Sequence, residues 1–313
     1  MRAIVFTGAG GPEVMALEQR PDPVPGSDEV LVEAAYSGIN PADLHQRAGH
    51  YPAPPGSPAD VPGLEVCGTV VACGEHVHDW SPGDRVFGVV GGGGLADRVV
   101  VNARHLARVP DRLDARQASA VPEAFITAHD AVFSQANIRP GERLLVNGAN
   151  GGVGLAAVQL GLATGLRVLA NARSPQCRER LAAMGAEPVS LDEAREVDVV
   201  LELVGAPNIP GDLEALAVRG RIVVVSTAAG SKVEMPLRAL MAKRAMMIGT
   251  LLRARPIEQK GAAVQAFARQ VVPLLESGEI VPVVDRDFPA EQAADAFDYM
   301  EQPGKFGKVL LAW

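Results

Sequence analysis

A cluster of glycines separates two apolar runs in the stretch LLVNGANGGVGLAAVQLG (144–161). The pattern is G-x-x-G-x-x-G rather than the strict G-x-G-x-x-G, because an alanine takes the place of one required glycine. Gly148 would allow a tight turn after a strand, and Gly154 would let a following helix pack close to a sheet. Gly151 and Gly152 would let the backbone approach a pyrophosphate, which the helix N-terminus would bind. The motif predicts dinucleotide binding, and the alternative for the turn alone is a glycine-rich loop without a ligand.

The choice between NAD and NADP is decided about 20 residues past the glycines, where an NAD-specific site has an acid that binds the ribose 2′-hydroxyl. The run RVLANA (167–172) ends there, with Asn171 in the position of that acid. Arg173, Ser174 and Arg178 follow and could bind a 2′-phosphate. The pattern therefore predicts NADPH as the cofactor, and the alternative is that both arginines are ordinary surface charges at a helix start.

These motifs need a parallel sheet to position them. From Gln117 onward, strand-like and helix-like runs alternate with short loops, which is typical of a parallel sheet covered by helices on both faces. RAMMIGT (244–250) is expected to be the last strand of this sheet. The spacing also predicts one helix over the run that begins at Gln117 and another over about 257–277.

The first ~115 residues have a different pattern, since short β-type runs are separated by turns rich in Pro and Gly. This predicts a second, mainly β unit. Within it, Asn40, Pro41 and Asp43 are typical of a helix start, because they occupy the N-cap, N1 and N3 positions.

The 313-residue chain carries a net charge of −8 and is 48% hydrophobic, which predicts a sizeable core and argues against a general nucleic-acid or anionic-membrane binder. No signal peptide is visible, and the uncharged run 144–166 is better explained as strand, turn and helix than as a membrane span. The three cysteines form no C-x-x-C pair and suit a reducing compartment. A cytoplasmic location is expected.

The chain resembles the medium-chain dehydrogenase/reductase superfamily, and within it the zinc-free quinone oxidoreductase (zeta-crystallin-like) family. The segments that carry the resemblance are YSGINPADLHQRAGHYPAPPGSPADVPGLEVCGTV (36–70), SPGDRVFG (81–88), ASAVPEAFITAHDAV (118–132), NGANGGVGLAAVQL (147–160), TLLRARP (250–256) and GKFGKVLLAW (304–313). The family implies an α/β fold: a Rossmann doubly wound parallel sheet over 121–255, and a GroES-like mainly β domain over 1–120 and 256–313.

The resemblance also implies roles for individual residues. Tyr51 would lie at the substrate pocket, where its hydroxyl could hold a carbonyl or quinone oxygen, and Asn40 would lie near the nicotinamide. The expected catalytic residues are Tyr51 and Asn40. The expected cofactor contacts are Asn40, Thr127, Gly148, Asn150, Gly151, Gly152, Val153, Gly154, Asn171, Arg173, Ser174, Arg178, Val204, Ser226, Thr227, Leu251, Leu252 and Arg253. Cys177 stands where the family has a lysine, which shifts 2′-phosphate binding to the arginines.

No metal is expected. Zinc-dependent relatives have a Cys and a His where this chain has Asn40 and Leu64, and Cys67 and Cys73 lack the partners of a four-ligand site. The predicted activity is NADPH-dependent hydride transfer to quinones or similar acceptors. Two alternatives stay open: reduction of an enone or enoyl C=C, and a non-catalytic NADPH-binding protein of crystallin-like or regulatory type. An apolar edge strand at 244–250 predicts a homodimer.

Overall fold

The computed structural model describes residues 1–313 and divides the chain into two compact units. The first unit comprises 1–126, 252–302 and 307–313, and the second comprises 127–251 and 303–306. The boundaries expected from the sequence followed residues 120 and 255. The observed division instead falls within a helix, α3 (Pro122–His129), and transfers a short C-terminal segment to the second unit.

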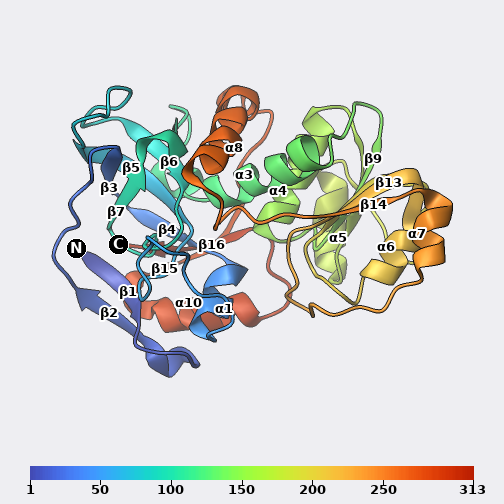
Figure 1. Cartoon of the computed structure of the whole chain (residues 1–313), viewed down its shortest axis with the longest axis horizontal. Helices are drawn as coiled ribbons and strands as arrows, with labels where there is room; N and C mark the ends of the chain where they lie inside the picture. The colour runs from blue at the N-terminus through green and yellow to red at the C-terminus, as the bar shows by residue number, and fades with distance from the viewer. The chain divides into compact units, whose positions relative to one another are not determined.

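The first unit is built on three small sheets (Figure 1). A five-stranded antiparallel sheet has the order β7-β3-β5-β6-β8, with β3 Glu29–Glu33, β5 Glu65–Cys73, β6 Arg85–Val89, β7 Arg98–Asn102 and β8 Leu106–Arg108. A second has the order β15-β16-β4, with β4 Tyr36–Ile39, β15 Val284–Pro289 and β16 Lys308–Ala312. The third is the antiparallel pair β1 Arg2–Phe6 and β2 Met15–Gln19. β16 does not alternate between buried and exposed residues, since four of its five residues are buried.

Helices close the core of the first unit: α1 Pro41–Arg47, α2 Ala115–Ala118, α8 Ile257–Gln270, α9 Val272–Ser277 and α10 Ala293–Glu301. Phe267 of α8 packs on Phe87 of β6, with ring centroids 5.6 Å apart. Phe297 of α10 makes an edge-on contact with Phe6 of β1 at 5.9 Å. The apolar faces of α8 and α10 therefore pack on the sheets.

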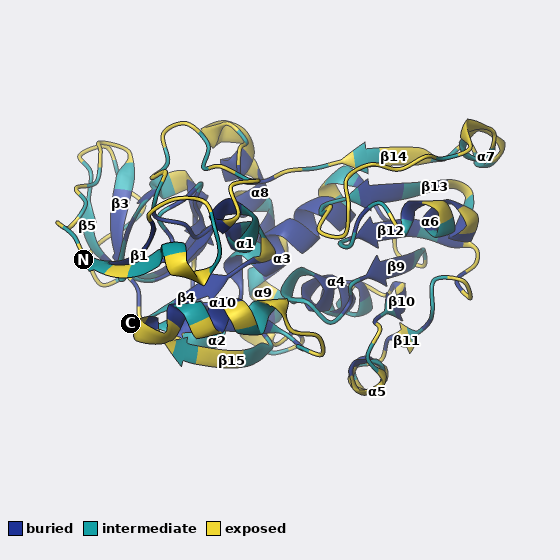
Figure 2. Cartoon of the chain, turned by 90° about the horizontal axis from the view of Figure 1, so that it is seen from below, coloured by how far each residue is buried: buried dark blue, intermediate teal, exposed yellow.

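The second unit is a six-stranded parallel sheet in the order β11-β10-β9-β12-β13-β14, as expected for the Rossmann domain. Its strands are β9 Arg143–Asn147, β10 Arg167–Asn171, β11 Glu187–Pro188, β12 Val197–Glu202, β13 Leu216–Val224 and β14 Met246–Gly249. Its helices include α4 Gly152–Ala163, α5 Pro175–Ala183, α6 Ile209–Ala215 and α7 Leu237–Lys243. The central strands β9 and β12 are almost wholly buried (Figure 2), as is typical of a sheet covered on both faces.

The outer edge of this sheet has a different surface. β14 pairs with β13 alone, and Figure 2 shows β14 and the neighbouring α7 largely coloured as exposed. Met246 is 54% exposed and Met247 37%, while Leu237 and Met241 of α7 are 64% and 74% exposed. We call these four residues the β14 edge patch.

Two predicted helices are wrong in extent, and proline explains both. The single helix expected over 257–277 is two helices with a break at Val271, because Pro273 in the first turn of α9 has no N–H to continue α8. The helix expected from Gln117 onward is broken before Pro122, which begins α3, and it ends in a π-helical turn, η3 (Asp130–Gln135).

Candidate functional site

The glycine turn lies between β9 and α4, as the motif predicts. Gly148 has φ +75°, a left-handed conformation that favours glycine. A Cβ on Gly154 would lie 2.4 Å from the carbonyl oxygen of Gly148, so the helix approaches the turn too closely for any other residue. By contrast, a Cβ on Gly151 would meet nothing closer than 3.6 Å. Folding therefore requires glycine at 148 and 154, the two ends of the turn, whereas a side chain at 151 would have room.

The N-terminus of α4 fits a pyrophosphate. Gly151 is its N-cap and supplies no side-chain cap, and the first turn carries no acidic residue. The N–H groups at the start of the helix are therefore directed outward without an internal acceptor. This open cradle of N–H groups and the positive end of the helix dipole suit a dinucleotide phosphate.

The residues that the sequence predicts at the cofactor ribose lie at the end of β10 and in the loop after it. The carbonyl of Asn171 accepts hydrogen bonds from the N–H groups of Gly148 and Ala149, each 3.1 Å long. Its side-chain amide donates to Oδ1 of Asn147 at 2.9 Å, so it points along the strand ends. Arg173 is exposed, whereas Nε of Arg178 donates to the carbonyl of Ala172 at 2.7 Å. Arg178 thus supports the loop that carries Arg173.

A C-terminal segment that the sequence did not predict for this unit joins the same region. Nδ2 of Asn150 donates to the carbonyl of Lys305 at 2.8 Å, and the Arg180 guanidinium lies 3.8 Å from the ring centre of Phe306. The Cys177 thiol lies 3.7 Å from the carbonyl oxygens of Gly304 and Lys305. The structure therefore brings a further cation, Lys305, to the unit that carries the glycine turn. No spacing in the sequence links residue 305 to residue 150.

The remaining residues expected at the cofactor are distributed over both units. Thr127, Val204, Ser226, Thr227 and Leu251 belong to the second unit, and Asn40, Leu252 and Arg253 belong to the first. Val204 and Ser226 lie in the loops that follow β12 and β13, at the same carboxyl-terminal edge of the sheet as the glycine turn. Thr127 is buried in α3, whereas Thr227 and Leu251 are exposed.

In the first unit, Asn40 is held by two buried charges. It is the N-cap of α1, with Pro41 at N1 and Asp43 at N3, which confirms the predicted helix start. Its Oδ1 accepts a 2.6 Å hydrogen bond from the ammonium of Lys308, and its Nδ2 donates to Oε1 of Glu65 at 2.9 Å. Lys308 and Glu65 also pair directly at 2.5 Å, and both side chains are at most 5% exposed. Nothing in the residues around Asn40 signals either partner, because both lie far from it in the sequence.

Asp43 is structural in this geometry. Its carboxylate accepts the N–H of Asn40 at 2.8 Å and the N–H of Gly63 at 3.0 Å. Burial raises the pKa of this carboxyl to about 6, although the two N–H groups oppose that effect. Asp43 therefore ties the start of α1 to the loop that contains Gly63.

Arg253 and Tyr51 form a second cluster. The Arg253 guanidinium is 6% exposed and donates to three acceptors: the carbonyls of Gly91 at 2.7 Å and Tyr51 at 3.1 Å, and Oε1 of Gln46 at 2.5 Å. It also lies 5.0 Å from the centre of the Tyr51 ring. Burial raises the pKa of the Tyr51 phenol, so the hydroxyl keeps its proton at neutral pH. Arg253 thus orients the loop that presents Tyr51.

One further buried cation lies near this cluster. Lys260 of α8 is 6% exposed, and burial lowers the pKa of its ammonium, an effect that the charge of Glu123 opposes. The helical pattern of 257–277 does not distinguish Lys260 from an exposed lysine, so its burial could not be predicted from the sequence.

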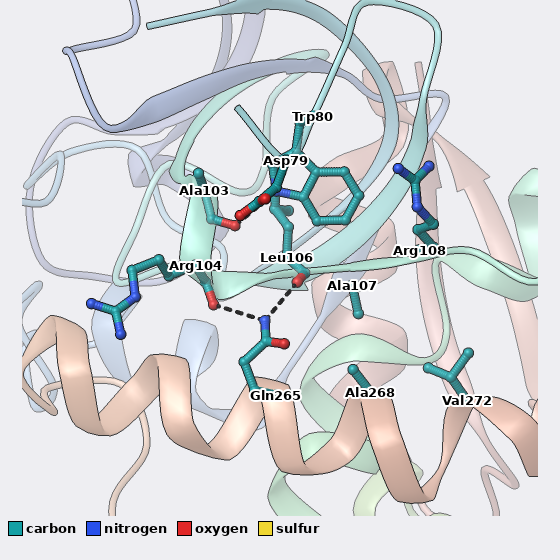
Figure 3. A pocket seen from close by; sticks show the side chains of 10 residues that line it. All are labelled: Asp79, Trp80, Ala103, Arg104, Leu106, Ala107, Arg108, Gln265, Ala268 and Val272. Atoms are coloured by element: carbon teal, nitrogen blue, oxygen red, sulfur yellow. Dashed lines mark hydrogen bonds between the residues drawn. The ribbon is translucent and has the colours of Figure 1, made fainter. Parts of the chain in front are cut away.

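A separate hollow of the first unit has a volume of about 460 Å³ and lies between β8 and α8 (Figure 3). It is lined by Trp80, Arg104, Arg108 and Gln265, among others, and by none of the residues expected at the active site. Gln265 donates to the carbonyls of Arg104 and Leu106, which tie the helix to the strand.

The structure also bears on metals and membranes. No group of three or more His, Cys, Asp or Glu side chains is arranged to hold a metal ion. None of the helices has both the length and the apolar character needed to cross a bilayer.

Comparison with known proteins places these features in a family. Two family models match: an alcohol dehydrogenase GroES-like domain over 26–111, and a zinc-binding dehydrogenase over 181–311. The quinone oxidoreductase of Mus musculus is 34% identical over 329 residues, with 99% of this chain and 97% of that protein covered. Among solved structures, a mycobacterial protein complexed with NADPH has a TM-score of 0.89 at 27% identity, covering 100% of both chains.

A third similarity is to the structure of CurK enoyl reductase, with a TM-score of 0.87 at 26% identity, covering 99% of this chain and 98% of that one. The resemblance inferred from the sequence is thereby confirmed, as is the fold of a Rossmann sheet with a GroES-like domain. The chain belongs to the quinone oxidoreductase family of the medium-chain dehydrogenase/reductase superfamily.

Proposed function

We propose that this protein is an NADPH-dependent reductase that delivers hydride to quinones or similar activated acceptors. The observation that carries the proposal is the open helix N-terminus behind the glycine turn, beside a β10 end that has Asn171 in place of an acid. Because no carboxylate stands there to repel a 2′-phosphate, NADPH is accommodated. NADPH, when bound, supplies the hydride, and the chain orients it and excludes water.

The chain contributes recognition at both ends of this reaction. Arg173 supplies positive charge for the 2′-phosphate. Tyr51 supplies a protonated phenol that donates a hydrogen bond to the acceptor oxygen and so favours the negative charge that develops there. Arg253 fixes the loop that holds Tyr51. Asn40 is placed by Lys308 and Glu65 at the start of α1.

Zinc is not required in this proposal. Asn40 and Leu64 stand at the positions of two zinc ligands in the zinc-dependent relatives, and neither side chain is a zinc ligand of the common kinds. Elemental analysis of purified, active protein is expected to show no stoichiometric zinc. One tightly held zinc per chain, lost together with activity, would refute this.

Reduction of an enoyl or enone C=C is the second candidate, supported by the similarity to CurK enoyl reductase. Both reactions need an electrophilic acceptor and a hydrogen-bond donor to its oxygen, so Tyr51 serves either one. A substrate panel separates them: higher kcat/KM for simple quinones supports the first, and higher kcat/KM for 2-alkenals or enoyl thioesters supports the second.

The main experiment follows the oxidation of NADPH and of NADH by a simple quinone. Turnover with a preference for NADPH is expected. NADPH binding without turnover on any quinone, alkenal or enone would favour a non-catalytic binding protein.

We also propose that the active form is a homodimer joined through the β14 edge patch. An apolar edge strand with one unpaired side can pair with the same strand of a second copy.

A further inference from the structure

A pair of buried carboxyl groups lies beneath the glycine turn, and the reaction proposed above does not use it. Glu202 ends β12, Asp212 lies in α6, and both are 0% exposed. The side-chain amide of Asn147, the residue before Gly148, donates to both: to Oε2 of Glu202 at 2.6 Å and to Oδ1 of Asp212 at 2.6 Å. One amide thus bridges two acids in the interior of the second unit.

The two acids have unequal support. Glu202 accepts hydrogen bonds from the N–H groups of Val204 and Gly205 on Oε1, and from Asn147 and Asn208 on Oε2. Asp212 accepts only the bond from Asn147, and its Oδ2 receives no hydrogen bond from any donor although it is fully buried. An ionised oxygen in that position would carry a large desolvation penalty.

A proton on Oδ2 of Asp212 removes this conflict. Two adjacent buried carboxylates repel one another, and the proton binds to the acid with fewer donors. Asp212 then donates to Glu202, and its unpartnered oxygen becomes a hydrogen-bond donor. In agreement with this geometry, burial raises the pKa of Asp212 to about 9, with further increases from the charge of Glu202 and from the hydrogen bond between the two acids. The side chains that bond to the pair are the neutral amides of Asn147, at the end of β9, and Asn208, the N-cap of α6. Asn171, at the end of β10, bonds to Asn147 and does not contact the acids.

We propose that Asp212 and Glu202 share one proton, and that this pair positions the cofactor-binding turn. Glu202 holds the loop after β12 through the N–H groups of Val204 and Gly205, and the shared amide of Asn147 fixes the residue that enters the glycine turn. Asn147 is in turn bonded to Asn171, whose carbonyl holds the N–H groups of Gly148 and Ala149. Asp212 is a positioning residue, and its role in cofactor binding rests on the function proposed above.

The pH dependence has a definite sign. The pKa of Asp212 is about 9 in the folded protein, and an unfolded aspartate has a pKa of about 3.9. Between these values the folded chain holds a proton that the unfolded chain releases, so the contribution of Asp212 to the free energy of unfolding falls as pH rises and levels off above about 9. Cofactor affinity depends on the folded protein alone, and it is expected to be flat up to about pH 9 and to fall above it.

Asp212→Asn is the matched test, because its amide donates to Glu202 and accepts from Asn147 without a titrating proton. For the wild type, the Kd for NADPH is expected to rise roughly tenfold per pH unit above about pH 9. Asp212→Asn should keep the neutral-pH Kd at alkaline pH. Above about pH 4 it should melt at a higher temperature than the wild type, because its unfolding releases no proton. Asp192→Asn, a surface substitution in the same unit, should behave as the wild type does.

Infrared difference spectra report the proton without any cofactor. The carbonyl band of a protonated, buried carboxylic acid is expected in the wild type at pH 7, absent in Asp212→Asn, and lost from the wild type above pH 10. Glu202→Gln provides a second test if Asp212→Asn fails to fold, because it removes the neighbouring carboxylate whose charge favours the proton on Asp212. The band should then shift in frequency or disappear.

A carboxylic-acid band that persists in Asp212→Asn, a band that Glu202→Gln leaves unchanged, or an alkaline loss of affinity that Asp212→Asn retains, would overturn the proposal. Failure of the wild type to bind NADPH at pH 7 would instead contradict the proposed function, and the infrared band and the melting curves would still decide whether the pair shares a proton.

Discussion

The buried ammonium of Lys308 donates a 2.6 Å hydrogen bond to the side-chain oxygen of Asn40 and pairs with Glu65 on its other side. β16 and β4, which lie side by side, supply Lys308 and the residue before Asn40. The orientation of Asn40 therefore depends on a strand at the opposite end of the sequence.

Replacement of Lys308 by methionine should destabilise the first unit strongly. The change leaves the Glu65 carboxylate buried without its cation, which typically reduces the free energy of unfolding by about 3–5 kcal/mol. Chemical denaturation measures the loss. Lys308→Met combined with Glu65→Gln should lose less than the single variant, because no unpaired charge remains, and Lys232→Met at an exposed site should lose almost nothing. Additive losses in the double variant would argue against the pairing.

Substitutions at two glycines of the turn should have different effects, one on folding and the other on cofactor binding. Gly154→Ala places a Cβ 2.4 Å from the Gly148 carbonyl and should lower the melting temperature. Gly151→Ala has room in the fold and an extended backbone that alanine tolerates, but its methyl group enters the cradle proposed for the pyrophosphate. It should keep the wild-type melting temperature and lose NADPH affinity. Unchanged NADPH affinity in a well-folded Gly151→Ala protein would place the phosphates elsewhere.

Cofactor preference should depend on Arg173. One charge-assisted hydrogen bond contributes about 1.5–3 kcal/mol, which corresponds to roughly a ten- to hundredfold preference for NADPH over NADH. Arg173→Ala should erase most of this preference and leave NADH binding intact. Arg167→Ala, at the opposite end of β10, is the matched control and should change neither affinity. Equal wild-type affinities for NADH and NADPH would refute the assignment.

Tyr51→Phe tests the acceptor site. Loss of one hydrogen bond to the acceptor is expected to lower kcat by up to about tenfold, with little change in the Kd for NADPH. Tyr36→Phe is the matched loss of a phenol hydroxyl and should leave kcat unchanged. Parallel losses of turnover and NADPH affinity in Tyr51→Phe would instead indicate that the ring packs the loop held by Arg253.

The β14 edge patch should control the oligomeric state. The wild type is expected to be a dimer by light scattering at micromolar concentration. Met246→Glu places a charge on the edge strand and should yield a monomer. Val24→Glu, at an exposed apolar position of the first unit, should leave the mass unchanged. A monomeric wild type would contradict the predicted dimer.

Periodicity and turn residues were enough to predict the alternating strands, the glycine turn and the helix start at Asn40, because each depends on residues close together in the chain. The helix breaks at Pro122 and Pro273 could have been predicted from the missing N–H groups. Lys308 beside Asn40, and Lys305 beside Cys177, could not, because these contacts join residues far apart in sequence. Asp212 could be assigned to α6 from the pattern, but not to the carboxylate that it faces.

The pairing of β4 with β16 also sets the order in which the chain can fold during its synthesis. β4, which ends at Ile39, can pair only after β16 has been synthesised, and β16 begins at Lys308, 269 residues after Ile39. At typical elongation rates of 5–20 residues per second this delay lasts about 15 to 50 s. Residues 127–251, which make up most of the second unit, leave the ribosome as one uninterrupted stretch within that interval. The parallel sheet of this unit can therefore form while β4 still has an open edge. A nascent chain stalled before residue 308 would therefore expose Tyr36–Ile39 to chaperones, with the Asn40 network not yet formed.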